Sequence, residues 1–168
     1  MTVVAGGDKT NAADVNSWLD RPIGRIRQGT AQSGIVNSTA TAVTFAATDE
    51  IDTHNFHDIV TNNTRVTPTV AGTYTVDGAV AIAGNTDYTQ VQVYLAKNGT
   101  AMAPAHRITP GATSNTLELQ TRAKIDCDGV SDYFEVFFQL TRSGAGTSGT
   151  VVSVQFASVL EWELARPA

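Results

Sequence analysis

Residues 73–83 read Thr-Tyr-Thr-Val-Asp-Gly-Ala-Val-Ala-Ile-Ala, and this stretch decides the fold. Every second position faces one way in an extended chain, and those positions are Tyr74, Val76, Gly78, Val80 and Ile82. Side chains of a β-strand point to opposite faces in turn, so a period of two predicts a strand with one face in a core. A helix would instead need apolar residues three and four positions apart.

The same alternation occurs on both sides of this stretch. Further strands are expected at residues 23–28, 42–46, 89–97, 100–103, 115–125, 133–141 and 151–164. The inward residues are Val91, Val93, Leu95, Leu117, Leu119, Phe134, Val136, Phe138, Leu140, Val152, Val154, Phe156, Ser158, Leu160 and Trp162. Asn98-Gly99 is a strong hairpin signal. The pattern predicts an all-β protein, an antiparallel jelly-roll sandwich of about eight to ten strands with a short N-terminal helix.

That helix is expected at residues 8–19, where the apolar side chains have helical spacing. Thr10 or Asn11 can cap it, and Pro22 ends it because proline disfavours helix in the residue before it. We therefore divide the chain into a docking segment at residues 1–29 and a jelly-roll domain at residues 30–168. The apolar face of so short a helix packs either on its own sandwich or on a neighbouring subunit. We favour the neighbour, because the helix lies outside the β pattern.

Charge and composition exclude several classes of protein. The net charge of the 168 residues is −5, whereas a general binder of nucleic acid needs a basic face. Apolar runs are much shorter than the ~20 residues of a membrane span, so no membrane insertion is expected. The start lacks the pattern of a signal peptide, which favours assembly in a cytoplasm. Cys127 is the single cysteine and is expected to pack without reacting.

Two acidic clusters offer a minor alternative of metal binding, but we expect neither a metal nor a cofactor. The first, residues 49–58, contains His54 and His57, which a regular strand would point to opposite faces. The second, with Asp126, Asp128 and Asp132, lacks the pattern of an EF-hand. No G-x-S-x-G motif is present, so we expect no enzyme. A glycosidase-type pair of carboxylates is the remaining enzymatic alternative.

The middle of the chain resembles a known family. Phe45, Asn55-Phe56, Pro68 and the step Gly72-Thr73-Tyr74 are similar to the globular heads of complement and tumour-necrosis-factor-like proteins, and so is the hairpin at residues 91–100. The resemblance covers roughly residues 35–164. It implies a ten-stranded jelly roll that is usually a homotrimer.

Apolar residues on both faces of residues 133–141 agree with a trimer, since a sheet face outside the core needs a partner. The residues expected at this interface are His54, Phe56, His57, Tyr133 and Phe137. Histidines there would make assembly depend on pH. The alternative is that Tyr133 and Phe137 pack beneath loops.

The start of the chain resembles another group of proteins. Residues 10–16 have the pattern T-x-A-A-D-x-N, which is similar to openings of structural proteins of tailed bacteriophages. The resemblance implies a non-enzymatic protein of the virion surface, a trimeric capsid decoration or head fibre bound to the major capsid protein or another virion protein. The residues expected to dock on an acidic shell are Val15, Trp18, Leu19, Arg21, Arg25 and Arg27. The alternative is a tail-tip module that binds a host-surface glycan or protein through loops at residues 84–88, 109–115 and 143–149.

Overall fold

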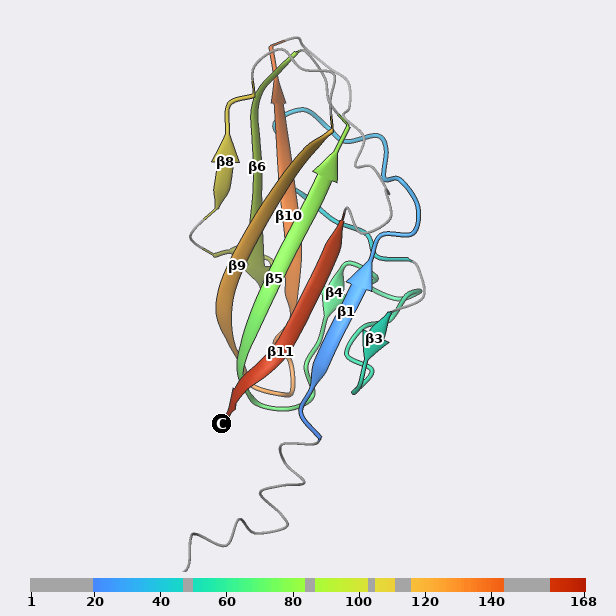
Figure 1. The fold of residues 1–168 in the computed structure, drawn as a ribbon, viewed down its shortest axis with the longest axis vertical. Coiled ribbons are helices and arrows are strands. Elements are labelled where there is room, and N and C mark those ends of the chain that lie inside the picture. The colour runs from blue at the N-terminus through green and yellow to red at the C-terminus, as the bar shows by residue number, and fades with distance from the viewer. Residues whose placement is uncertain (1–19, 47–49, 84–86, 103–104, 111–115, 144–157) are drawn as a thin grey trace, which may run out of the picture.

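The computed structural model describes residues 20–46, 50–83, 87–102, 105–110, 116–143 and 158–168. These residues form two antiparallel β-sheets packed face to face (Figure 1). The predicted all-β sandwich is therefore confirmed. Eleven strands are present within the described ranges, several of them only two residues long. The helix predicted at residues 8–19 lies outside the described residues.

The first sheet has the strand order β3-β1-β11-β5-β9. Its members are β3 (Ile51–Asp52), β1 (Ile23–Arg27), β11 (Val159–Pro167), β5 (Gly72–Ile82) and β9 (Leu117–Cys127). The second sheet has the order β2-β10-β6-β7, with β4 on β10 and β8 on β6. Its members are β2 (Thr41–Ala42), β10 (Phe134–Arg142), β6 (Tyr88–Lys97), β7 (Thr100–Ala101), β4 (Arg65–Val66) and β8 (His106–Ile108).

The core lies between the two sheets and is built from the alternating positions of the long strands. On β5 the inward residues Tyr74, Val76, Val80 and Ile82 are fully buried. The inward residues of β6 and β10 are buried as predicted, as are Leu119, Ser158, Leu160 and Trp162; Leu117 is half-buried. Val152, Val154 and Phe156 lie outside the described residues. Burial of each large apolar side chain contributes about 1.5–3 kcal/mol.

The sandwich begins earlier in the chain than predicted. β1 lies inside the first sheet, with β3 on one side and β11 on the other. Its pairing with β11 runs from Ile23 opposite Glu163 to Arg27 opposite Val159. The jelly-roll domain therefore includes Ile23–Arg27, which the sequence had assigned to the docking segment. The period of two was already visible in this stretch. It is explained by the place of β1 between β3 and β11, where alternate side chains face the core.

The two ends of the sandwich differ in what they carry (Figure 1). The chain enters β1 at the end where β11 finishes, and the turn from β9 to β10 lies at the same end. At the opposite end, β5 and β10 finish and β6 and β9 begin. We call these the entry end and the far end.

A substitution at Gly24 tests the packing between β1 and β11. A Cβ atom at this position would lie 1.9 Å from Cζ2 of Trp162. We expect Gly24→Ala to lower the free energy of unfolding by about 3 kcal/mol, at the upper end of the cost of overpacking a core. Urea unfolding followed by circular dichroism measures the loss.

Gly34→Ala is the control for this prediction. A Cβ atom added at Gly34 would meet no other atom within 4 Å, and the residue has a φ of +76°. Only backbone strain of about 1–2 kcal/mol is therefore expected. Equal losses in the two variants would contradict the packing argument.

Candidate functional site

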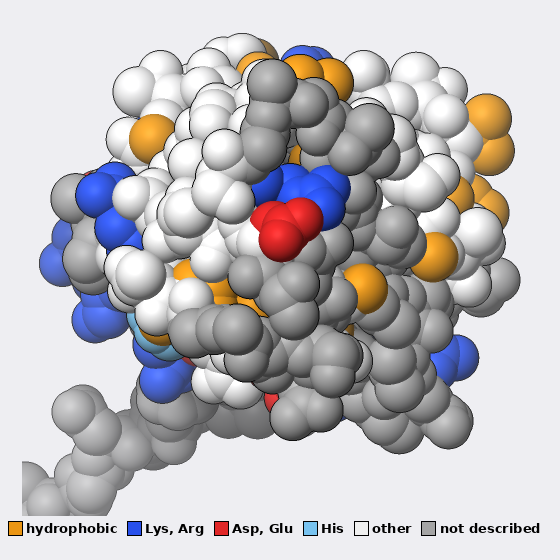
Figure 2. Space-filling model, turned by 90° about the horizontal axis from the view of Figure 1, so that it is seen from above, with side chains coloured by type: hydrophobic (Ala, Val, Ile, Leu, Met, Phe, Trp, Pro, Cys, Tyr) orange, Lys and Arg blue, Asp and Glu red, His pale blue; other side chains and the backbone are white. Residues whose placement is uncertain are grey.

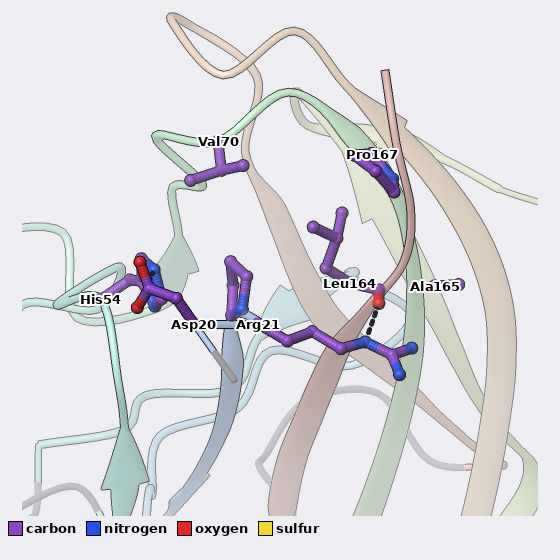
Figure 3. Close-up of a pocket in the computed structure, with 8 residues that line it drawn as sticks. Asp20, Arg21, His54, Val70, Leu164, Ala165 and Pro167 are labelled. Atoms are coloured by element: carbon purple, nitrogen blue, oxygen red, sulfur yellow. Dashed lines mark hydrogen bonds and ion pairs between the residues drawn. The ribbon is translucent and has the colours of Figure 1, made fainter. Parts of the chain in front are cut away.

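A groove of about 410 Å³ lies at the entry end (Figure 3). Three of its residues, Asp20, Arg21 and Pro22, immediately precede β1, and the last strand contributes another three. The full lining is Asp20, Arg21, Pro22, His54, Val70, Leu164, Ala165 and Pro167. The first and last parts of the chain thus form its walls, because β1 and β11 are hydrogen-bonded neighbours.

The polar groups around this groove already have partners. The Nε atom of Arg21 donates to the backbone oxygen of Leu164, and its Nη2 lies 3.6 Å from Oε1 of Glu163. His54 Nε2 lies 3.6 Å from an oxygen of Asp20, and His54 Nδ1 lies 2.9 Å from Oγ1 of Thr53. The rest of the lining is mostly aliphatic. The groove therefore suits an apolar group better than a charged one, and its lining contains no serine or cysteine nucleophile.

The three arginines predicted to face an acidic shell are paired within the protomer. Arg25 Nε lies 2.8 Å from Glu50, and its Nη1 lies 3.2 Å from Glu161. Arg27 Nε lies 3.2 Å from the other oxygen of Glu50. With Arg21 beside Glu163, each guanidinium has a carboxylate neighbour. The excess positive charge that motivated an acidic partner is therefore balanced locally.

The remaining residues predicted for docking are Val15, Trp18 and Leu19. They lie outside the described residues, so their role stays a prediction. The described chain begins one residue later, at Asp20, on the rim of the groove.

Two of the residues predicted for a trimer interface are buried in their own protomer. Phe56 is 3% exposed and packs edge-on against Tyr74, with ring centroids 6.1 Å apart. His57 is 7% exposed and packs edge-on against Phe45. Neither side chain has surface left to offer a second copy, which corrects the prediction for both. The third residue of this group, His54, is half-buried at the groove.

Tyr133 and Phe137 belong to the outward side of the second sheet. Phe137 stacks on Tyr94 across the β6–β10 pair, with ring centroids 5.6 Å apart and planes within 5°. Arg65 lies over the ring of Tyr133 at 4.1 Å. All three aromatic rings are half-buried. Within the part of the chain that the structure describes, Tyr133 and Phe137 therefore keep part of their surface exposed and are not fully covered by loops.

A row of hydrogen-bonded side chains runs beside this aromatic pair. Arg107 Nε donates to Gln92 at 3.0 Å, Gln92 donates to Gln139, and Gln139 Nε2 donates to the backbone oxygen of Ser38. Each donor points the same way across β8, β6 and β10, so the row orders this side of the sheet. Sequence reasoning missed the row. Its signal was the outward parity of Gln92 and Gln139, but their pairing depends on strand register.

The acidic turn after β9 is held by its own backbone and by a lysine. Asp128 accepts the backbone N–H groups of Asp132, Val130 and Ser131, which hold the pKa of its carboxyl well below the usual range. Lys97 Nζ lies 2.8 Å from Asp132 and lowers the pKa of that carboxyl. Within the described ranges, no group of three or more His, Cys, Asp or Glu side chains is placed to hold a metal ion. The carboxylates of this turn bond to protein donors.

Among the residues that the structure describes, no helix has the length and apolar character needed to cross a bilayer.

The fold can be compared with solved structures. Crystal structures of murine APRIL at pH 5.0 and pH 8.5 each match with a TM-score of 0.59, at 9% and 10% sequence identity. A third, at pH 8.0, matches with a TM-score of 0.57. Each match covers 86% of this chain and 98% of the murine chain. No protein family and no curated protein matches the sequence. The chain is thus a tumour-necrosis-factor-like jelly roll by fold.

Cys127 gives a test of the chemistry at this end of the sandwich. The thiol is 5% exposed, and burial raises its pKa to about 12. A raised pKa means that almost no thiolate exists at pH 8, and the thiolate is the reactive form. We expect no reaction of the folded protein with Ellman's reagent at pH 8, and one thiol per chain after unfolding in guanidinium chloride. Rapid labelling of the folded protein would contradict the described burial.

Proposed function

We propose that this chain is a non-enzymatic structural protein of a virion surface, a homotrimeric capsid decoration or head fibre held to the shell by the residues that precede β1. The observation that carries the proposal is the division between the two ends of the sandwich. The described chain enters β1 at the entry end, whereas β5 and β10 finish and β6 and β9 begin at the far end. A protein built this way can be held at one end while it presents the other.

The opening of the chain supports a virion setting. Residues 10–16 carry the pattern that resembles structural proteins of tailed bacteriophages. Nineteen residues before Asp20 are also enough chain to reach a second protein, since an extended residue spans roughly 3.3–3.6 Å. The contacts to the shell are proposed for Val15, Leu19 and their neighbours in this segment. The major capsid protein or another virion protein is the proposed partner.

The outward side of the second sheet supports self-association. Phe137, Tyr94 and Tyr133 are half-buried there, next to the oriented row of Gln92 and Gln139. By contrast, the outward side of the first sheet carries ion pairs such as Asp77 with Arg122 at 3.1 Å. Desolvating ion pairs is costly, whereas covering aromatic rings is favourable. We therefore propose that like copies meet through the aromatic side of the second sheet.

The far end supports the second candidate, a tail-tip module that binds a host-surface glycan or protein. The strand ends that flank residues 84–86, 111–115 and 144–157 gather there (Figure 1). Figure 2 views the protein from this end. Most of the described surface there is uncharged, and basic side chains meet acidic ones near the centre of the view. Loops on a rigid sandwich are frequent sites of recognition. The proposed shell anchor and such recognition use opposite ends.

Removing residues 1–19 tests the anchor. We expect the shortened protein to stay folded and trimeric but to lose binding to particles that lack this protein, measured by co-sedimentation. Cutting before Asp20 keeps the hydrogen bond from Leu164 N to Pro22 O and the contact of Arg21 with Leu164. A variant lacking only residues 1–7, which precede the predicted helix, is the matched control and should bind. Equal binding by the 1–19 deletion, or binding of the isolated protein to host cells but not to shells, would contradict the anchor.

Phe137→Asp tests the proposed contact between copies. A carboxylate beside Tyr94 would be desolvated if the face is covered in the assembly, so we expect the trimer to dissociate in analytical ultracentrifugation. Gln120→Asp places the same carboxylate on the exposed side of the first sheet, on β9, and should leave the trimer intact. The opposite result, with dissociation only by Gln120→Asp, would assign the contact to the other sheet.

A further inference from the structure

The groove at the entry end has a mainly apolar lining. Val70, Leu164 and Pro167 form much of its wall, and the polar residues around it are engaged with one another. Its volume of about 410 Å³ lies within the range of roughly 300–1,000 Å³ that holds a small organic group. An aromatic side chain is of the right size and chemistry to cover such a surface.

We propose that the side chain of Trp18 from the same chain occupies this groove. Asp20 is itself part of the lining, and Trp18 precedes it by two residues. Two residues of chain span at most roughly 7 Å, so the indole reaches the hollow without any rearrangement of the sandwich. The inference concerns the free protein and does not depend on the proposed virion role.

The chemistry of the groove favours Trp18 over its neighbour Leu19. The alternation that buries Pro22 and Gly24 stops at Asp20, which lies in a turn with its side chain 87% exposed, so parity does not choose between the two residues. An indole covers more apolar surface than a leucine side chain, and it also donates a hydrogen bond at the polar rim.

The size and polarity of the Trp18 indole also match those of the groove. A tryptophan buries about 150–250 Å² of surface, and its N–H group needs an acceptor near the edge of the buried area. The Asp20 carboxylate at the rim, whose side chain is 87% exposed, provides an acceptor. The groove has no unpaired charge in its lining that would call for an ionic ligand.

The short tether favours the same chain over a second copy. A group joined by so few residues is present at an effective concentration of the order of millimolar, which a second protein at micromolar concentration does not match. Once Trp18 is seated, residues just before it have a fixed direction relative to the sandwich. Trp18 is then a positioning residue for the N-terminal segment rather than a contact to the shell.

Tryptophan fluorescence tests whether the Trp18 side chain occupies the groove. The only other tryptophan of the chain, Trp162, is 3% exposed, so the difference between the full-length protein and Trp18→Phe isolates the emission of Trp18. We expect this difference emission to be blue-shifted, with several-fold weaker acrylamide quenching than in the urea-unfolded protein. Ala165→Glu places a carboxylate in the groove at an exposed position and should shift the emission to the red and restore quenching. Val36→Glu, at a 63% exposed site outside the groove, is the matched control and should change neither.

Two results would overturn the inference. The first is a solvent-like Trp18 emission in the full-length protein, or one that Ala165→Glu leaves unchanged. The second is a blue shift that grows with protein concentration, which would place the segment in the groove of a second copy. A solvent-exposed Trp18 together with intact binding to particles would remove this inference and leave the proposed function standing.

Discussion

The structure depends on the position of β11 between β1 and β5. The last strand pairs with the first described strand along one edge and with the central strand along the other. Because of this arrangement, the first and the last described strands lie side by side inside the first sheet, and loss of either β1 or β11 would open the core. Trp162 shows how close the fit is, since its ring occupies the space that a side chain at Gly24 would need. The groove follows from the same pairing, because its walls are the residues just before β1 and those at the end of β11.

The period of two was a sufficient guide for the long strands and failed where the chain is irregular. On β5, β6 and β10 the parity of each residue is set by an extended backbone, so inward positions could be predicted from the sequence. Between β3 and β4 the backbone turns through left-handed residues, Asn55 with φ 53° and Asn62 with φ 56°. After such a turn, the alternation of inward and outward side chains no longer continues from the preceding strand. The chain folds back so that His57 bridges to Val66, and this buries Phe56 and His57, which the sequence had placed at an interface.

The charges show a second limit of sequence reasoning. Arg21, Arg25 and Arg27 form a basic cluster along the chain, and this cluster suggested an acidic partner. Their carboxylate neighbours, Glu50, Glu161 and Glu163, are brought in by β11 and by the segment before β3. Local sequence cannot reveal such neighbours, of which Glu161 and Glu163 lie more than a hundred residues away along the chain. The same reason explains why the row from Arg107 to Ser38 was not expected, although Arg107, Gln92 and Gln139 lie on the outward side of their strands.

These corrections change how the two outward faces can be used. The first sheet presents charges that already satisfy one another, and an interface that buried them would have to replace their hydration as well as their pairing. The second sheet presents stacked rings beside an oriented row of amides, which lose little when water is removed. With the N-terminal segment leaving at the entry end, a copy-to-copy contact through the second sheet would place several such segments side by side. Several weak anchors joined in one assembly bind far more tightly than one, so the proposed self-association and the proposed anchoring would reinforce each other.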